Sequence, residues 1–237
     1  MKFKSPFKEN KKSIVFQTVL QNFPENYIDY NYCEPFCVGS NVFLNKIQSK
    51  EEVISDIDCK SINILRAIRD EPKDFFNKLK KIKNHEKVFK QALLAQEFED
   101  YIEEATNEFI LIKLSKGNKK KNFHLVEENW QKSIEECEKI TNRLKDILIV
   151  CEPPEKIIET WNSEESFIFI NPPQEDTENI NLNSHIKILE LVNKSNAKII
   201  ISGYFSTLYN RMLKGWKTIK NITGNEKTKG EIIWKNF

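Results

Sequence analysis

Apolar and polar residues follow one another along the chain at helical and strand spacings in turn. Residues 13–23 carry apolar side chains at helical spacing behind a polar stretch, with Ser13 as a plausible N-cap, and predict a helix. The aromatic-rich segment 27–36 predicts a short strand that ends at Pro35. Residues 37–46 predict a turn that leads into a helix or a second apolar run.

The middle of the chain becomes more helical and more charged. Residues 51–58 predict a strand with carboxylates at its end, and residues 59–82 predict a helix interrupted at Pro72. From 83 to 145 the chain carries long amphipathic, highly charged segments, broken at 114–124 by "LSKGNKKKNFH". This pattern predicts a small helical insertion with a basic loop.

Strands and helices alternate again after the insertion. The predicted strands are 147–151, 167–170 and 197–204, and the predicted helices follow Pro154 and span 184–195 and 206–216. This alternation is typical of an α/β fold with a mostly parallel sheet that is covered on both faces. We therefore predict one α/β domain from residues 1–82 and 146–237, into which 83–145 is inserted.

Charge and cysteine content narrow the class of protein. The 37 basic and 35 acidic residues leave a net charge of only +2, so a DNA-binding surface must be a local patch. Five cysteines show no CxxC pair, although Cys33 and Cys37 could in principle clamp a metal. With no signal peptide and no long apolar run, the chain is expected to be a reduced, cytoplasmic protein without structural zinc or a membrane segment.

The stretch "SFIFINPPQED" contains the first candidate for chemistry. Four apolar residues, Phe167 to Ile170, run directly into Asn171-Pro172-Pro173-Gln174, which indicates a buried strand that stops where proline removes a backbone donor. Open α/β sheets bind ligands at such strand ends. An ordinary turn is the alternative interpretation.

The basic loop is the second candidate. Four lysines surround Gly117 and Asn118, namely Lys116, Lys119, Lys120 and Lys121. A solvated turn and a set of DNA phosphate contacts are both compatible with this composition.

The order and spacing of these motifs resemble the Dam-like adenine-N6 DNA methyltransferases, in the short form common in phages and prophages. "CEPFCVGSNVFLNK" is similar to the family's EPFxGG loop, "FIFINPPQ" to its DPPY loop, and "GEIIWKNF" to its final strand. The resemblance covers nearly the whole chain. It implies a Rossmann-like, S-adenosylmethionine-dependent methyltransferase sheet that acts on double-stranded DNA without a metal.

The resemblance also implies roles for individual residues. The cofactor-binding residues would be Lys11, Glu34, Pro35, Phe36, Gly39, Ser40 and Asp56. The catalytic loop would be Asn171, Pro172, Pro173 and Gln174, and the lysine loop would contact DNA. Asp58 is the alternative to Asp56 as ribose acceptor, because strand alternation puts both on one side, although the family register favours Asp56.

Three positions depart from the family pattern. Glu9-Asn10-Lys11 stands where the family has Gly-Gly-Lys, Val38 stands at a glycine position, and Gln174 replaces the aromatic residue. A β-branched residue at a position that needs positive φ would cost about 1–3 kcal/mol in strain. Loss of an aromatic platform removes base stacking of about 1–3 kcal/mol.

These departures leave alternatives open. The first is a catalytically degenerate methyltransferase that binds DNA or a protein partner. Methylation of another amide or amine is a further alternative, against which the Glu-Pro-Phe element argues. His185, at the start of a predicted helix, is expected to be a surface or capping residue.

Overall fold

The computed structural model of the protein describes residues 3–7, 13–39, 41–83, 85–115, 120–124, 127–173, 182–220 and 231–237. The strands are β1 (Asn31–Glu34), β2 (Glu51–Ser55), β3 (Leu148–Val150), β4 (Ser166–Ile170), β5 (Lys198–Tyr204), β6 (Lys217–Ile219) and β7 (Glu231–Lys235). The helices are α1 (Ser13–Gln21), η1 (Tyr27–Asp29), α2 (Val42–Asn45), α3 (Cys59–Asp70), α4 (Pro72–Lys80), α5 (His85–Leu94), α6 (Tyr101–Lys113), α7 (Glu127–Leu144), α8 (Pro154–Thr160), α9 (Leu182–Asn193) and α10 (Thr207–Met212). The predicted alternation of strands and helices is confirmed.

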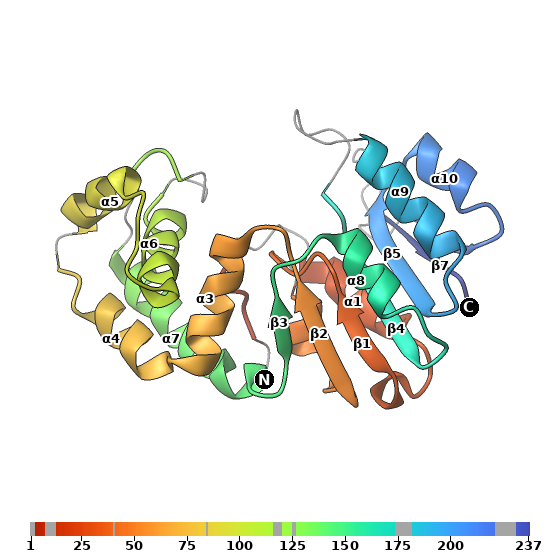
Figure 1. The fold of residues 1–237 in the computed structure, drawn as a ribbon, viewed down its shortest axis with the longest axis horizontal. Coiled ribbons are helices and arrows are strands. Elements are labelled where there is room, and N and C mark those ends of the chain that lie inside the picture. Colours follow the sequence, from red (N-terminus) through yellow and green to blue (C-terminus); the bar gives the residue numbers. More distant parts are fainter. Residues whose placement is uncertain are drawn as a thin grey trace.

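The strands form one seven-stranded sheet in the order β3-β2-β1-β4-β5-β7-β6 (Figure 1). β1 to β5 pair in parallel, and β7 runs antiparallel to both β5 and β6. The chain moves outward from β1 to β3 and then returns to place β4 on the other side of β1. This reversal is the topological switch point, and it opens at the carboxyl ends of β1 and β4. This topology agrees with the predicted Rossmann-like α/β sheet.

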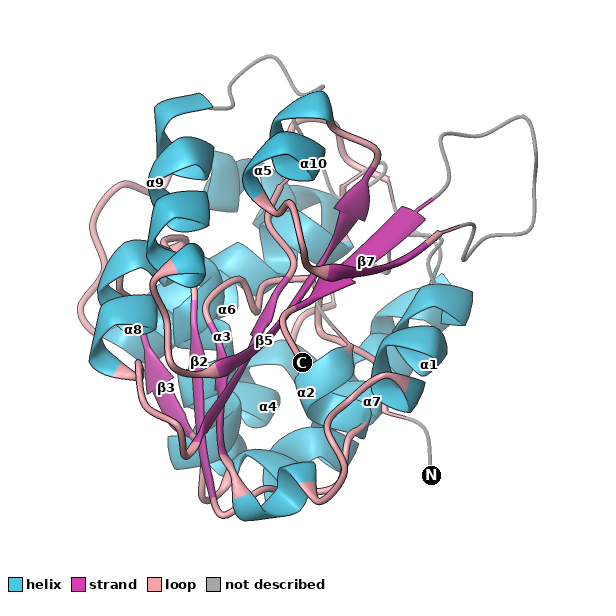
Figure 2. Cartoon of the chain, turned by 90° about the vertical axis from the view of Figure 1, so that its right-hand side faces the viewer, coloured by secondary structure: helices cyan, strands magenta, loops and turns pink. Residues whose placement is uncertain are grey.

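Helices cover both faces of the sheet, as its unbroken apolar strands require. Every residue of β4, "SFIFI", is buried. Phe167 and Phe169 join one core cluster, whereas Ile168 and Ile170 join the other, so successive side chains face opposite layers. Figure 2 shows α8 and α9 on one side of the strands and α1 and α2 on the other.

Helices α4 to α7 form a helical segment that packs onto the sheet domain through α3. Helices α4, α5, α6 and α7 gather beside α3 at the β3 edge (Figure 1). Phe75 of α4, Phe109 of α6 and Ile134 of α7 belong to the same buried cluster as Tyr32 of β1. The segment and this face of the sheet therefore share one continuous core.

A disulfide joins Cys59 to Cys151, with the two Cα atoms 5.2 Å apart. The expectation that all the cysteines are reduced is therefore wrong for this pair. The two residues are 92 positions apart in the chain, and parallel pairing of Ser55 with Val150 brings their neighbourhoods together at the carboxyl ends of β2 and β3. No local cysteine spacing could have indicated this contact.

Candidate active site

The loop after β1 begins at the switch point and turns back over β2. The Cys37 amide donates to the Ser55 carbonyl at 3.0 Å, which ties the loop to the end of β2. Gly39 has a φ of +83°, and a Cβ built on it would meet nothing within 4 Å. Val38 does not have a positive φ, so the backbone strain expected at this residue is absent. The left-handed conformation falls on the glycine that the loop retains.

Asp56, directly after β2, holds this loop in place. Its Oδ2 accepts a hydrogen bond from the Val38 amide, and its Oδ1 accepts one from the Asp58 amide, each at 3.1 Å. Burial raises the pKa of the Asp56 carboxyl above its ordinary value of 3.8. The carboxylate thus joins the loops that follow β1 and β2.

Asp58 has a different role, which separates the two aspartates. Its side chain caps α3, accepting from the Ser61 amide at 3.3 Å and the Ser61 hydroxyl at 2.7 Å. Between the two lies Ile57, whose side chain is 67% exposed. An exposed isoleucine beside a half-buried carboxylate is a feature that the sequence interpretation missed.

Glu34 and Pro35 lie beneath the loop rather than on its surface. Both are buried, and Glu34 accepts a hydrogen bond from the Tyr32 hydroxyl at 2.5 Å. Phe36 is half-buried and packs against the core cluster that contains Cys33 of β1 and Ile157 of α8. Of the residues expected to contact cofactor, Glu34 and Pro35 are therefore buried and Phe36 is half-buried.

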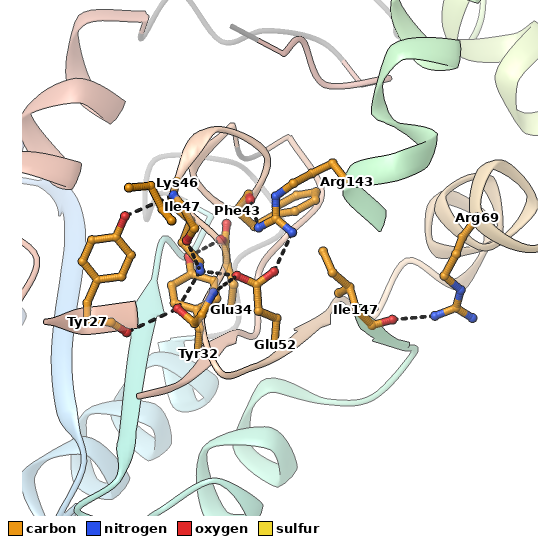
Figure 3. Close-up of polar contacts among 11 residues, drawn as sticks. Tyr27, Tyr32, Glu34, Phe43, Lys46, Ile47, Glu52, Arg69, Arg143 and Ile147 are labelled. Carbon is orange, nitrogen blue, oxygen red and sulfur yellow. Dashed lines mark hydrogen bonds and ion pairs between the residues drawn. The ribbon is translucent and has the colours of Figure 1, made fainter. Parts of the chain in front are cut away.

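A buried ionic cluster lies next to Glu34 (Figure 3). Glu52 forms ion pairs with Lys46 and with Arg143, the latter at 2.6 Å. The Lys46 ammonium also lies 4.1 Å from the centre of the Tyr32 ring. Burial lowers the pKa of Lys46 to about 8. This cluster connects α7 to β1 and to the start of β2.

Asn171 stands at the carboxyl end of β4, across the switch point from the β1 loop. Its Oδ1 accepts a hydrogen bond from the Ser202 hydroxyl of β5 at 3.0 Å. Pro172 is buried and Pro173 is exposed. The first three residues of the predicted catalytic loop are thus placed at the ligand-binding edge of the sheet.

The end of β5 adds aromatic side chains to this edge. Phe205 follows β5 and is 56% exposed, which is unusual for so large an apolar side chain. Burial raises the pKa of Tyr204, and the negative charge of Glu231 and a hydrogen bond to that carboxylate raise it further. Phe205 was not predicted as a site residue, although its place after a buried strand could have indicated it.

The structure describes two of the four predicted DNA-contacting lysines. Lys120 forms an ion pair with the buried Glu108, and its ammonium lies 4.0 Å from an oxygen of Asp58. Lys121 is exposed. The charge of Lys120 is therefore largely neutralised within the protein.

Several predicted positions lie outside the described residues: Lys11, Ser40, Lys116, Lys119 and Gln174. His185 is not the surface or capping residue that was expected. It is buried in α9, and its Nδ1 lies 2.6 Å from the Tyr209 hydroxyl. Within the described ranges, no three His, Cys, Asp or Glu side chains are grouped to hold a metal ion. None of the described helices combines the length and apolarity needed to cross a membrane.

Comparison with known proteins agrees with this architecture. The sequence model for the D12 class of N6 adenine-specific DNA methyltransferases matches residues 10–184. A type II methyltransferase, M.CviBI of Paramecium bursaria Chlorella virus NC1A, is 26% identical over 162 residues. That similarity covers 63% of this chain and 62% of the viral protein, so the chain spans less than two thirds of its relative.

Proposed function

Because the chain belongs to the D12 class of N6 adenine-specific DNA methyltransferases, we propose that it methylates the N6 amine of adenine at specific sites in double-stranded DNA. The methyl donor is S-adenosylmethionine. One observation carries the proposal: Asn171 follows β4 directly across the switch point from the loop held by Asp56. The proposed amine-binding group and the proposed cofactor loop would thus lie at one edge of the sheet.

The loops after β1 and β2 fit the cofactor. Gly39 leaves open space where a side chain would otherwise stand, so the backbone can approach a ligand. Asp56 has carboxylate acceptor sites for ribose hydroxyls, and the exposed Ile57 offers apolar surface to the adenine ring of the cofactor. Lys11 and Ser40 complete the proposed set. When bound, the cofactor supplies an electrophilic methyl group.

The end of β4 would hold the target amine. The N6 lone pair is delocalised into the adenine ring, so the amine is a poor nucleophile unless its N–H groups are held by acceptors. Asn171 Oδ1 and the Pro172 carbonyl are the proposed acceptors, on a base flipped out of the duplex. The proposed role of Asn171 and Pro172 is to hold the amine in line with the methyl group that a bound cofactor would supply, and no covalent bond to the protein is needed.

Two features of the chain would bind DNA. Gln174 cannot stack on a base, and the exposed ring of Phe205 beside the same edge is the proposed replacement. Lys121 is exposed and is the proposed phosphate contact, with Lys116 and Lys119. The ion pair of Lys120 with Glu108 gives that lysine a structural role instead.

A second candidate function follows from Gln174. A methyltransferase sheet that has lost the aromatic of its catalytic loop could serve as a DNA-binding or protein-binding subunit without turnover. The two candidates differ in whether the cofactor site is open and productive.

Calorimetric titration with S-adenosylmethionine, followed by a methylation assay on unmethylated genomic DNA, tests the proposal. We expect saturable micromolar binding and N6-methyladenine in the digested nucleosides. Asn171→Ala should abolish the product without abolishing cofactor binding. Ser166→Ala, which removes a buried hydroxyl at the opposite end of β4, is the matched control and should keep both. Absence of binding at millimolar S-adenosylmethionine would refute the proposed methyltransferase activity and favour the role of a DNA-binding or protein-binding subunit.

A further inference from the structure

The target-amine site contains an amide, and an amide has two chemically different ends. In a carboxylate either oxygen can accept the N–H of an amine. In Asn171 only Oδ1 can accept, because Nδ2 carries two hydrogens and would oppose the N–H groups of the substrate. An unrestrained Asn171 would therefore present the wrong end for part of the time.

Ser202 is placed to remove this ambiguity. Its hydroxyl donates to Asn171 Oδ1 at 3.0 Å. The contact arises from the sheet itself, because Ile170 pairs with Ile201 and so sets residues 171 and 202 side by side at the ends of β4 and β5. A carbonyl oxygen has two acceptor sites, so Oδ1 keeps one for the substrate.

The position of the Ser202 hydroxyl is itself well defined. Ser202 is 5% exposed and lies on β5, which pairs with β4 on one side and with β7 on the other. A strand that is paired on both sides cannot shift without breaking ladder hydrogen bonds. The serine hydroxyl therefore has a fixed position beside the amide, and from there it donates to Asn171 Oδ1.

We propose that Ser202 is a positioning residue for methyl transfer, which holds the Asn171 amide with its oxygen available to the N6 amine. This role rests on the proposed function. It also explains how Asn171 can replace a carboxylate as the acceptor although only one of its two terminal atoms is an oxygen.

A double-mutant kinetic cycle of Ser202→Ala and Asn171→Asp tests the role. Loss of one neutral hydrogen bond is worth a factor of roughly two to ten, so Ser202→Ala should lower kcat by that factor. The KM for S-adenosylmethionine should not change. In the Asn171→Asp background the same serine substitution should have no effect, because both carboxylate oxygens accept. Ser202→Thr, which keeps the hydroxyl, should retain the activity.

The cycle has two outcomes that overturn the role. One is an equal loss in both backgrounds, which would mean that Ser202 supports the strand and not the amide. The other is a gain of activity in Ser202→Ala, which would mean that the serine sequesters the oxygen. Ser166→Ala controls for removal of a buried strand hydroxyl.

A cycle of unfolding free energies separates this role from the proposed function. Ser202→Ala and Asn171→Ala should be non-additive in urea unfolding, because they remove the same hydrogen bond. Additive effects would overturn the contact and the role, whatever the activity. A coupled pair in a chain that methylates no DNA would overturn the role together with the proposed function, and would show that the contact serves the fold.

Discussion

Replacement of Asp56 and of Asp58, one at a time, tests the division of labour between the two aspartates. Asp56 links the loops after β1 and β2 through the amides of Val38 and Asp58. Asp58 caps α3 through Ser61. We expect Asp56→Ala to weaken cofactor binding and Asp58→Ala to lower stability only.

The magnitudes follow from the contacts. A hydrogen bond from a ribose hydroxyl to a carboxylate contributes about 1.5–3 kcal/mol. Its loss in Asp56→Ala should raise the Kd for S-adenosylmethionine by roughly tenfold to a hundredfold. Removal of the Asp58 cap should cost about 0.5–2 kcal/mol of unfolding free energy and leave the Kd unchanged.

Isothermal titration calorimetry and urea unfolding of the two variants measure these effects. The pH dependence adds a second test, because burial raises the pKa of Asp56 above 3.8. A protonated carboxyl loses acceptor capacity, so cofactor affinity should fall as the pH is lowered, at a higher pH than an unperturbed aspartate would produce. Equal loss of affinity in both variants, or unchanged affinity in Asp56→Ala, would refute the assignment of Asp56 to the ribose.

Other parts of the molecule give further tests. Since burial lowers the pKa of Lys46 to about 8, the folded protein releases this proton before the unfolded chain does. Stability should then rise between pH 8 and the ordinary pKa of 10.5, and Lys46→Met should remove that rise in urea midpoints. Phe205→Ala should lower kcat/KM for DNA roughly fivefold to a hundredfold with cofactor affinity unchanged, whereas Leu93→Ala, exposed on α5, should change neither. Gln174→Tyr should raise methyl transfer, and an unchanged rate would show that no stacking surface is missing. Thiol titration of the unfolded, unreduced chain should find the three thiols of Cys33, Cys37 and Cys137, and all five cysteines as thiols would contradict the disulfide.

The layered fold could be predicted because its signals are local. The run "FIFI" before Asn171 and the run "KIIIS" before Gly203 each indicate a buried strand by composition alone. A segment with helical periodicity lies between the two runs. Pro72 also acts as predicted, since it ends one helix and begins the next as the N1 residue of α4. These features depend on neighbours within a few residues.

The buried ionic cluster could not be predicted, because its members come from distant segments. Charged residues such as Lys46, Glu52 and Arg143 usually lie on the surface. Only the packing of α7 against the start of β2 buries these three together. A buried charge is tolerated when it is paired, and a single sequence does not show the pairing. The same reasoning applies to Lys120, whose partner Glu108 is buried on α6.

The register of the sheet was a signal that the sequence interpretation did not use. Alignment of the two buried runs at their carboxyl ends sets Asn171 beside Ser202. This placement needs only the assumption that the strands are adjacent and parallel. The register between β2 and β3 brings Cys59 and Cys151 together in the same way, but β3 is too short to predict that register from composition.

The departures from the family pattern weigh less against turnover once the described residues are considered. Val38 lies in an unstrained conformation, and its amide binds Asp56, so the β1 loop does not need a glycine there. Asn171 loses the symmetry of a carboxylate, but a fixed hydroxyl donor stands at 3.0 Å from its oxygen. Gln174 lies outside the described residues, and Phe205 is an exposed ring at the neighbouring strand end. Val38 and Asn171 leave the described geometry of the two loops intact, so we propose that catalysis depends most on whether Phe205 can stack on a flipped base.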